Sequence, residues 1–74
     1  MSESKKIFLT QLGGQIRKKR IEKGISQAEL ARKIYKDKQS LERVENGKTN
    51  PSIYYLLEVA RGLDLSLNEL LSEF

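Results

Sequence analysis

The chain is short, basic and free of both cysteine and histidine. Its 74 residues suffice for one small domain, which no disulfide can support. The usual zinc ligands and the most common general base are missing as well, so we expect no enzyme, no catalytic residues, no metal and no cofactor.

The net charge of +4 is unevenly distributed along the chain. Residues 1–50 hold 13 of the 14 Lys and Arg residues but only 6 of the 10 Asp and Glu residues. This basic part suits a polyanion, whereas the acidic, Leu-rich remainder suits packing or a protein partner. No apolar run has the length of a membrane span and no signal peptide is visible, which favours a cytoplasmic protein without membrane contact.

The beginning of the chain predicts a tail followed by a helix. We expect the polar residues 1–6 to form a flexible tail ahead of a single domain over residues 7–74. Apolar residues then recur at four-residue spacing, at Phe8, Leu12 and Ile16, in a helix that ends near residue 24. Two adjacent glycines at positions 13 and 14 weaken this helix and indicate either close packing or a loose N-terminal end.

The second predicted helix has the clearest start signal in the chain. Ser26 and Glu29 have the spacing of a capping box. The buried stripe of this helix is expected at Leu30, Ala31 and Ile34. A third helix follows almost at once, with Asp37 as its N-cap and Gly47 after its end. Two short helices joined so closely must cross steeply, as in a helix-turn-helix.

The third predicted helix has a polar edge that suits a DNA major groove. Leu41 and Val44 can seat one side on a core, so the other side faces outward. That outward edge carries side chains that pair with base edges and phosphates, namely Lys38, Gln39, Ser40 and Arg43. Gln39 can pair with adenine, whereas Lys and Arg pair with guanine. The alternative is an edge that is merely solvated.

Two more helices complete an all-α prediction. Apolar residues at three- and four-residue spacing from Ile53 to Leu63 indicate a fourth helix. Ser66 and Glu69 have the spacing of a second capping box, which opens a short helix ending at residue 74. This last helix is more apolar than its length requires, so part of it is expected to form a two-fold dimer contact. The candidate dimer residues are Leu65, Leu67, Leu71 and Phe74.

Many short matches over about residues 12–71 are in register with one known family. They are clearest in the run from Gln27 to Ala31 and in the run from Glu45 to Thr49. These runs are similar to the Cro/repressor (XRE) helix-turn-helix family, and to the DNA-binding domains of lambdoid phage repressors in particular. The resemblance implies a five-helix lambda-repressor-like bundle whose third helix enters the major groove. It also implies a partly buried ion pair between Arg20 and Glu45.

The resemblance adds contacts outside the third helix, because the family residue that matches Gln27 meets the DNA backbone. The candidate DNA-binding residues are therefore Gln27, Lys36, Lys38, Gln39, Ser40, Arg43, Asn46, Lys48, Thr49 and Tyr55. The chain departs from the family at Tyr35 and Lys36, where the family often has Gly and a small apolar residue. This departure predicts a changed turn and a phosphate contact by Lys36. The remaining basic side chains of the run 17–20 are expected to be solvated.

The sequence as a whole predicts a DNA-binding transcriptional regulator. We expect a homodimer that reads a near-palindromic operator in double-stranded DNA. No small-molecule ligand is expected, because so small a bundle has little interior for a pocket. The alternative is an antitoxin, a restriction-modification controller or an adaptor whose main role includes binding a protein partner.

Overall fold

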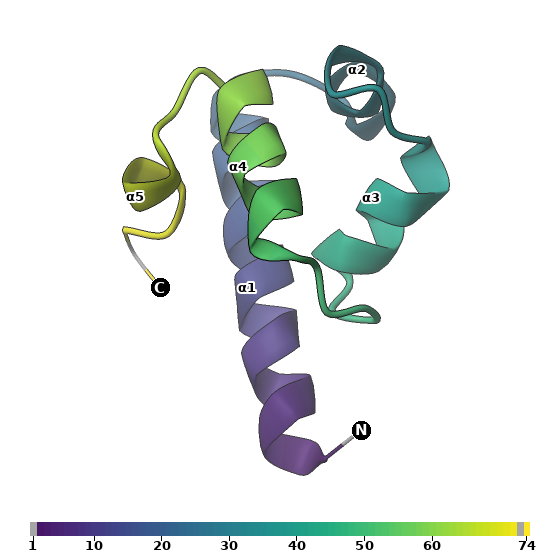
Figure 1. The fold of residues 1–74 in the computed structure, drawn as a ribbon, viewed down its shortest axis with the longest axis vertical. Helices are drawn as coiled ribbons and strands as arrows, with labels where there is room; N and C mark the ends of the chain where they lie inside the picture. Colours follow the sequence, from purple (N-terminus) through teal and green to yellow (C-terminus); the bar gives the residue numbers. More distant parts are fainter. Residues whose placement is uncertain (1, 73) are drawn as a thin grey trace.

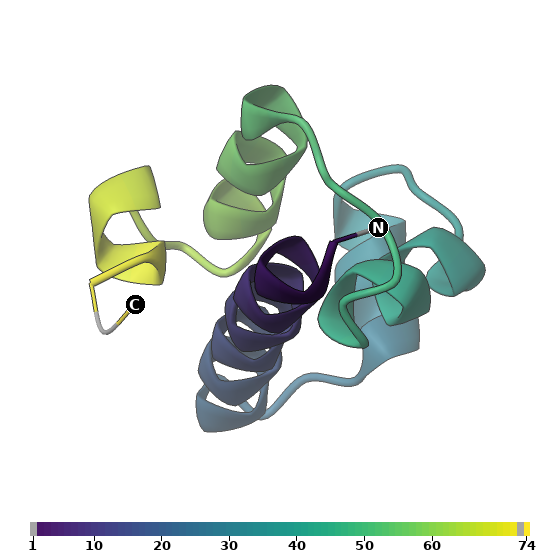
Figure 2. The same cartoon turned by 90° about the horizontal axis from the view of Figure 1, so that it is seen from below.

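The computed structural model describes residues 2–72 and 74, and this part of the chain is all helical, as predicted (Figure 1). Its helices are α1 (Glu3–Glu22), α2 (Gln27–Lys33), α3 (Lys38–Glu45), α4 (Ile53–Gly62) and α5 (Leu67–Leu70). α1 runs through the middle of the fold, with α2 and α3 on one side and α5 on the other (Figure 2). α4 contacts both α2 and α5 and thereby joins the two sides.

Every one of these helices begins at a side-chain cap. The caps are Ser2, Ser26, Asp37, Ser52 and Ser66, and each accepts a hydrogen bond from the backbone N–H three residues later. Both predicted capping boxes are present. The backbone N–H groups of the two box serines donate to Glu29 and Glu69 at 3.0 and 2.8 Å. These backbone hydrogen bonds lower the pKa of both carboxyl groups.

The predicted tail over residues 1–6 is corrected by the structure. α1 begins at Glu3, because the hydroxyl oxygen of Ser2 accepts a hydrogen bond from the backbone N–H of Lys5 at 3.2 Å. Residue 1 lies outside the described residues. The first turns of α1 extend beyond the other helices (Figure 1). The side chains of these turns are therefore exposed, although the backbone is helical.

The first four helices share one kind of ending. The residue after each C-cap has a left-handed backbone, with φ of 73° at Gly24, 59° at Tyr35, 71° at Gly47 and 58° at Asp64. The following N–H then donates to the carbonyl five residues earlier, as in the 2.9 Å bond from Lys36 to the residue 31 carbonyl. These bonds satisfy the last helical carbonyls, and they turn the chain sharply toward the next element.

Tyr35 retains the turn that a glycine would favour. This tyrosine adopts a left-handed φ of 59° and makes the hydrogen bonds typical of a helix end. A left-handed backbone costs a residue with a side chain about 1–2 kcal/mol. The Tyr35 side chain is 94% exposed, so packing contacts do little to offset this cost.

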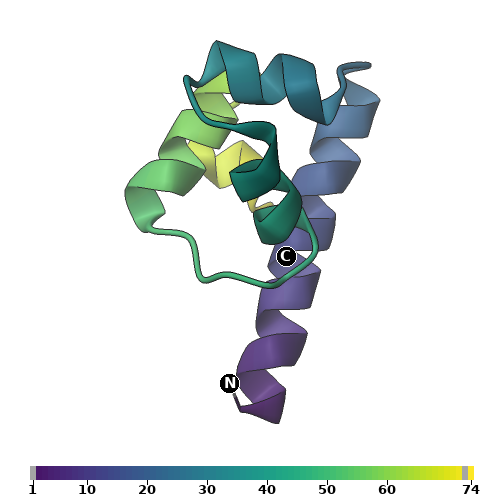
Figure 3. The same cartoon turned by 90° about the vertical axis from the view of Figure 1, so that its right-hand side faces the viewer.

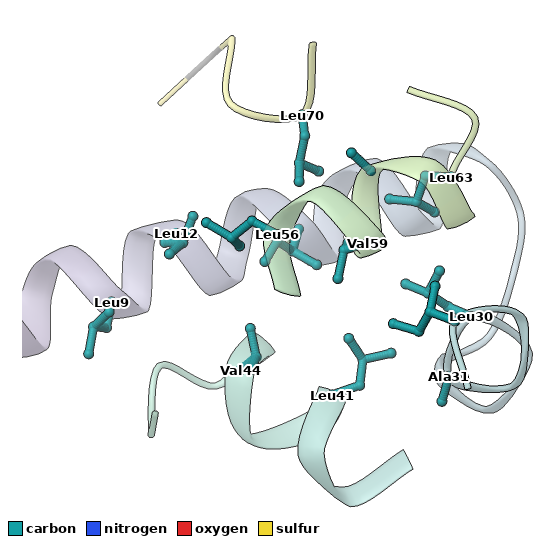
Figure 4. Packing of buried hydrophobic residues seen from close by; sticks show 13 residues of the cluster. Leu9, Leu12, Leu30, Ala31, Leu41, Val44, Leu56, Val59, Leu63 and Leu70 are labelled. Atoms are coloured by element: carbon teal, nitrogen blue, oxygen red, sulfur yellow. The ribbon is translucent and has the colours of Figure 1, made fainter. Parts of the chain in front are cut away.

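All five helices contribute side chains to one core (Figure 4). The most completely buried of these are Ile16, Leu30, Leu41, Val59, Leu63 and Leu70. Phe8 and Ile53, whose spacing helped to predict α1 and α4, lie in these helices but are 51% and 65% exposed. Leu9 is buried instead of its neighbour Phe8, because the projecting end of α1 meets the rest of the fold along only one narrow face.

Gly13 lets α1 and α3 approach closely. A Cβ atom at this position would lie 2.5 Å from the carbonyl oxygen of Glu45 and closer still to that of Val44. Gly47, just after α3, lies against Thr10 of α1 in the same contact. A Cβ on Gly14 would meet nothing within 4 Å. Close packing therefore explains Gly13 but not its neighbour.

Alanine at the two adjacent glycines should have opposite effects on stability. Gly13→Ala should lower the free energy of unfolding by about 1–3 kcal/mol, because the new methyl group meets α3 backbone that cannot move aside. Gly14→Ala should raise it by about 0.5–1 kcal/mol, because the site is open and Ala favours the helix. Urea unfolding of both variants measures this. Equal shifts of the same sign would contradict the close contact between α1 and α3.

Replacing Tyr35 by Gly should stabilise the protein by about 0.5–1 kcal/mol, because the strained backbone is relieved and few contacts are lost. Tyr35→Ala is the matched control, since it removes the same ring but keeps a Cβ in the left-handed conformation. Thermal unfolding should rank the Gly variant above both the Ala variant and the parent chain. An Ala variant as stable as the Gly variant would show that the backbone is not strained.

Candidate nucleic-acid interface

α3 divides sharply into a buried and an exposed side. Leu41 and Val44 are 0% and 4% exposed, whereas the side chains of Lys38, Gln39 and Arg43 lie at the surface. α3 lies in front of the other helices in Figure 3, between α1 and the segment that leads to α4. Its outward side therefore offers a row of hydrogen-bond donors that no other element covers.

Two of the predicted DNA-binding residues, Ser40 and Tyr55, contact each other. The Ser40 hydroxyl donates to the carbonyl oxygen of Asp37 at 3.1 Å and lies 3.3 Å from the Tyr55 hydroxyl. Either hydroxyl group can be the donor of this pair. Both residues are half-buried, and burial raises the pKa of Tyr55. The pair ties α4 to the first turn of α3.

Lys36 also has partners inside the chain. Its ammonium group lies 3.5 Å from a carboxylate oxygen of Glu58 and 6.0 Å from the centre of the Tyr55 ring. The side chain is exposed, as predicted for a residue that does not pack in the core. Its two partners both belong to α4, so Lys36 contributes to the same tie between the turn and α4.

A buried ion pair joins α1 to α3. The guanidinium group of Arg20 donates two hydrogen bonds to the carboxylate of Glu45, at 2.7 and 3.0 Å, and a third at 2.9 Å to the carbonyl of Ile25. The side-chain amide of Gln27 donates to the same carboxylate at 2.9 Å. These side chains hold α1, the start of α2 and the end of α3 in one arrangement. Gln27 is therefore oriented by Glu45 at the edge of the exposed surface.

The remaining predicted contacts follow α3. Asn46 and Lys48 are exposed and Thr49 is half-buried, on the segment that Gly47 anchors against α1. Asn46 and Gln27 line one groove beside α1, whereas Lys48 and Thr49 are not among the residues that line it.

Arg17 is exposed, as expected for the basic side chains near Arg20, and it lines a groove with several predicted DNA-binding residues. A surface groove of 610 Å³ runs between α1, the start of α2 and α3, and Arg17, Gln27, Lys38 and Asn46 are among the residues that line it. Arg17 precedes Arg20 by one helical turn and so shares its side of α1. The family resemblance assigned Arg20 to an ion pair, and the other basic side chains of the run 17–20, including Arg17, were expected to be solvated.

A second surface is apolar. The rings of Phe8 and Phe74 meet edge to face, with their centres 4.8 Å apart, and Phe74 remains 47% exposed. They border a cavity of 320 Å³ that Ile53 and Leu71 also line. The other predicted dimer residues, Leu65 and Leu67, are partly buried against the core. The exposed apolar surface therefore includes residues of α1 and of the start of α4, which the sequence-based prediction of a dimer contact did not include.

Two further observations concern the part of the chain that the structure describes. No helix in it is long and apolar enough to cross a membrane. No three His, Cys, Asp or Glu side chains among these residues come together as possible metal ligands.

Comparison with known proteins agrees with this geometry. A helix-turn-helix family model matches residues 16–70. The HTH-type transcriptional regulator SinR of Bacillus licheniformis is 44% identical over 63 residues, which are 84% of this chain and 57% of SinR. The chain thus spans little more than half the length of that relative.

Two solved structures share the fold. The restriction-modification controller protein C.AhdI from Aeromonas hydrophila has a TM-score of 0.81 and 35% identity, over 84% of this chain and 90% of its own. The clp gene regulator ClgR from C. glutamicum has a TM-score of 0.82 and 30% identity, over 86% and 82%. The chain therefore belongs to the Cro/repressor (XRE) family of helix-turn-helix domains.

Proposed function

We propose that this chain is a sequence-specific DNA-binding transcriptional regulator that inserts α3 into the major groove of double-stranded DNA. The orientation of α3 is the main support: its apolar side is fixed in the core while Lys38, Gln39 and Arg43 face outward together. The major groove is about 12 Å wide and admits one α-helix. The relatives named above are regulators, in agreement with this role.

Each outward side chain has a base edge that suits it. Gln39 can form two hydrogen bonds with adenine, and Lys38 and Arg43 can donate to guanine. Ser40 is already bonded to the Asp37 carbonyl and to Tyr55, so we assign Ser40 and Tyr55 mainly to orienting α3. Recognition of the base sequence is thus assigned to Lys38, Gln39 and Arg43, whose side chains form no such bonds within the part of the chain that the structure describes.

The polar residues near α3 suit the DNA backbone. Gln27 and Asn46, which line the groove beside α1, and Lys48 and Thr49, which follow α3, would meet phosphates. Gln27 uses one amide proton for Glu45, and its second amide proton can reach a phosphate oxygen. Lys36 would exchange its contact with Glu58 for a phosphate when DNA binds. These contacts position the helix and make affinity strongly dependent on salt.

The regulator would work as a homodimer on a near-palindromic operator. Two copies related by a two-fold axis place their recognition helices about 34 Å apart, in successive major grooves. The apolar surface around Phe8, Ile53 and Phe74 is the best exposed candidate for the contact between copies. Regulation would follow from operator occupancy without any chemical step. We place this activity in the cytoplasm.

Selection from random duplex DNA tests the proposal. Several rounds of binding at physiological salt should recover an inverted repeat whose half-sites lie about one helical turn apart. Sedimentation of the protein on that duplex should show two chains per site. Recovery of a single half-site would contradict the homodimer, and salt-sensitive binding without any consensus would contradict sequence-specific recognition.

Gln39→Ala should relax base preference at one position of each half-site. The loss of discrimination there should be about 1–3 kcal/mol, because a pair of hydrogen bonds to one base disappears. Binding to random duplex should barely change, and Gln11→Ala, on the exposed surface of α1, is the control. Competition binding against single-base operator variants measures the effect. Uniform weakening at all positions would instead assign Gln39 to the backbone.

A second candidate function rests on the apolar surface. An antitoxin, controller or adaptor would use Phe8, Ile53 and Phe74 to bind a different protein rather than a second copy. This function would be favoured if the selection from random duplex DNA recovers no consensus sequence. Phe74→Ser should then abolish binding of that protein while leaving the weak, salt-sensitive DNA affinity intact.

A further inference from the structure

The side chain of Arg17 lies in the groove beside α3 and has no role in the contacts described above. It lines the 610 Å³ groove between α1, the start of α2 and α3, together with Lys38 of the recognition helix. The side chain is exposed, and it forms no hydrogen bond or ion pair among the described residues. A guanidinium group is thus available beside the α3 surface that faces outward.

The charges in this groove favour an anion. Arg20 also lines it, but its charge is balanced by the buried carboxylate of Glu45. Three further charged side chains line it, namely Arg17, Lys38 and the carboxylate of Glu42. Two cations therefore face one anion, and the planar guanidinium of Arg17 is the group best shaped to hold a phosphate by two hydrogen bonds.

The position of the groove indicates which phosphate it meets. A helix in the major groove has a sugar-phosphate backbone on each side. In Figure 3, α1 lies on one side of α3 and α4 on the other, and the groove lined by Arg17 lies on the α1 side. Among the predicted DNA-binding residues, Gln27, Lys38 and Asn46 line this groove, and Lys38 alone of these three is charged. Arg17 adds a second cation beside them.

We propose that Arg17 binds a DNA phosphate on the α1 side of the recognition helix. This inference rests on the proposed function and adds a charged contact that the sequence had assigned to solvent. Arg17 would carry affinity for DNA of any sequence, while Gln39 and its neighbours carry the preference for one sequence.

The salt dependence of DNA binding tests this contact. Binding of the parent chain and of Arg17→Gln to the selected operator and to a random duplex should be measured between about 50 and 200 mM salt. The variant should lose roughly three- to tenfold in affinity for both duplexes, so that their affinity ratio is unchanged. The slope of log K against log salt should fall in magnitude by about 0.9, the value for one lost phosphate contact.

Arg61→Gln is the matched control. It removes the same charge from α4, where Arg61 lines a different surface cavity with Tyr35 and Tyr54. Its salt slope should equal that of the parent chain. An unchanged slope for Arg17→Gln, or an equal change in both variants, would overturn the Arg17 contact. Failure of the parent chain to bind either duplex would instead overturn the proposed function, and urea unfolding shows whether each variant is folded.

Discussion

The buried contact between α1 and α3 is the constraint on which the rest of the structure depends. The carboxylate of Glu45 accepts hydrogen bonds from Arg20 and Gln27, while Gly13 lets the two helices come close enough for that network to form. A buried ion pair adds little net stability compared with apolar residues, but removing one partner costs about 3–5 kcal/mol. Its main effect here is on orientation, because one carboxylate fixes the end of α3 relative to α1 and to the start of α2.

The other end of α3 is held by weaker contacts. Ser40 meets the Tyr55 hydroxyl, and Lys36 pairs with Glu58, so α4 supports the first turn of α3 and the preceding turn. Each of these half-exposed contacts contributes on the order of 1 kcal/mol or less. α3 is therefore attached rigidly at its C-terminal end and more loosely at its N-terminal end.

The sequence predicted the helices and their caps because these depend on residues a few positions apart, as in the box formed by Ser26 and Glu29. The Arg20 and Glu45 pair came from the family resemblance, since no local spacing connects residues so distant. The exposure of Phe8 and Ile53 is a further feature that the sequence does not show. Helical spacing shows which residues share a side of a helix, but it does not show whether another helix covers that side. The left-handed backbone of Tyr35 was missed because residue preference alone argues against it.

The hydrogen bonds at the capping boxes and the burial of Tyr55 act together on the charge of the protein. The chain has no His or Cys, so none of its side chains ordinarily titrates between about pH 5 and 9. The backbone bonds from the cap serines move the pKa of Glu29 and Glu69 further down, and burial moves the pKa of Tyr55 further up. Both shifts move the titration of these three groups further from the physiological range. Ionic strength can thus modulate the electrostatic interactions of this protein, whereas a change of pH within the physiological range leaves the charge of its side chains the same.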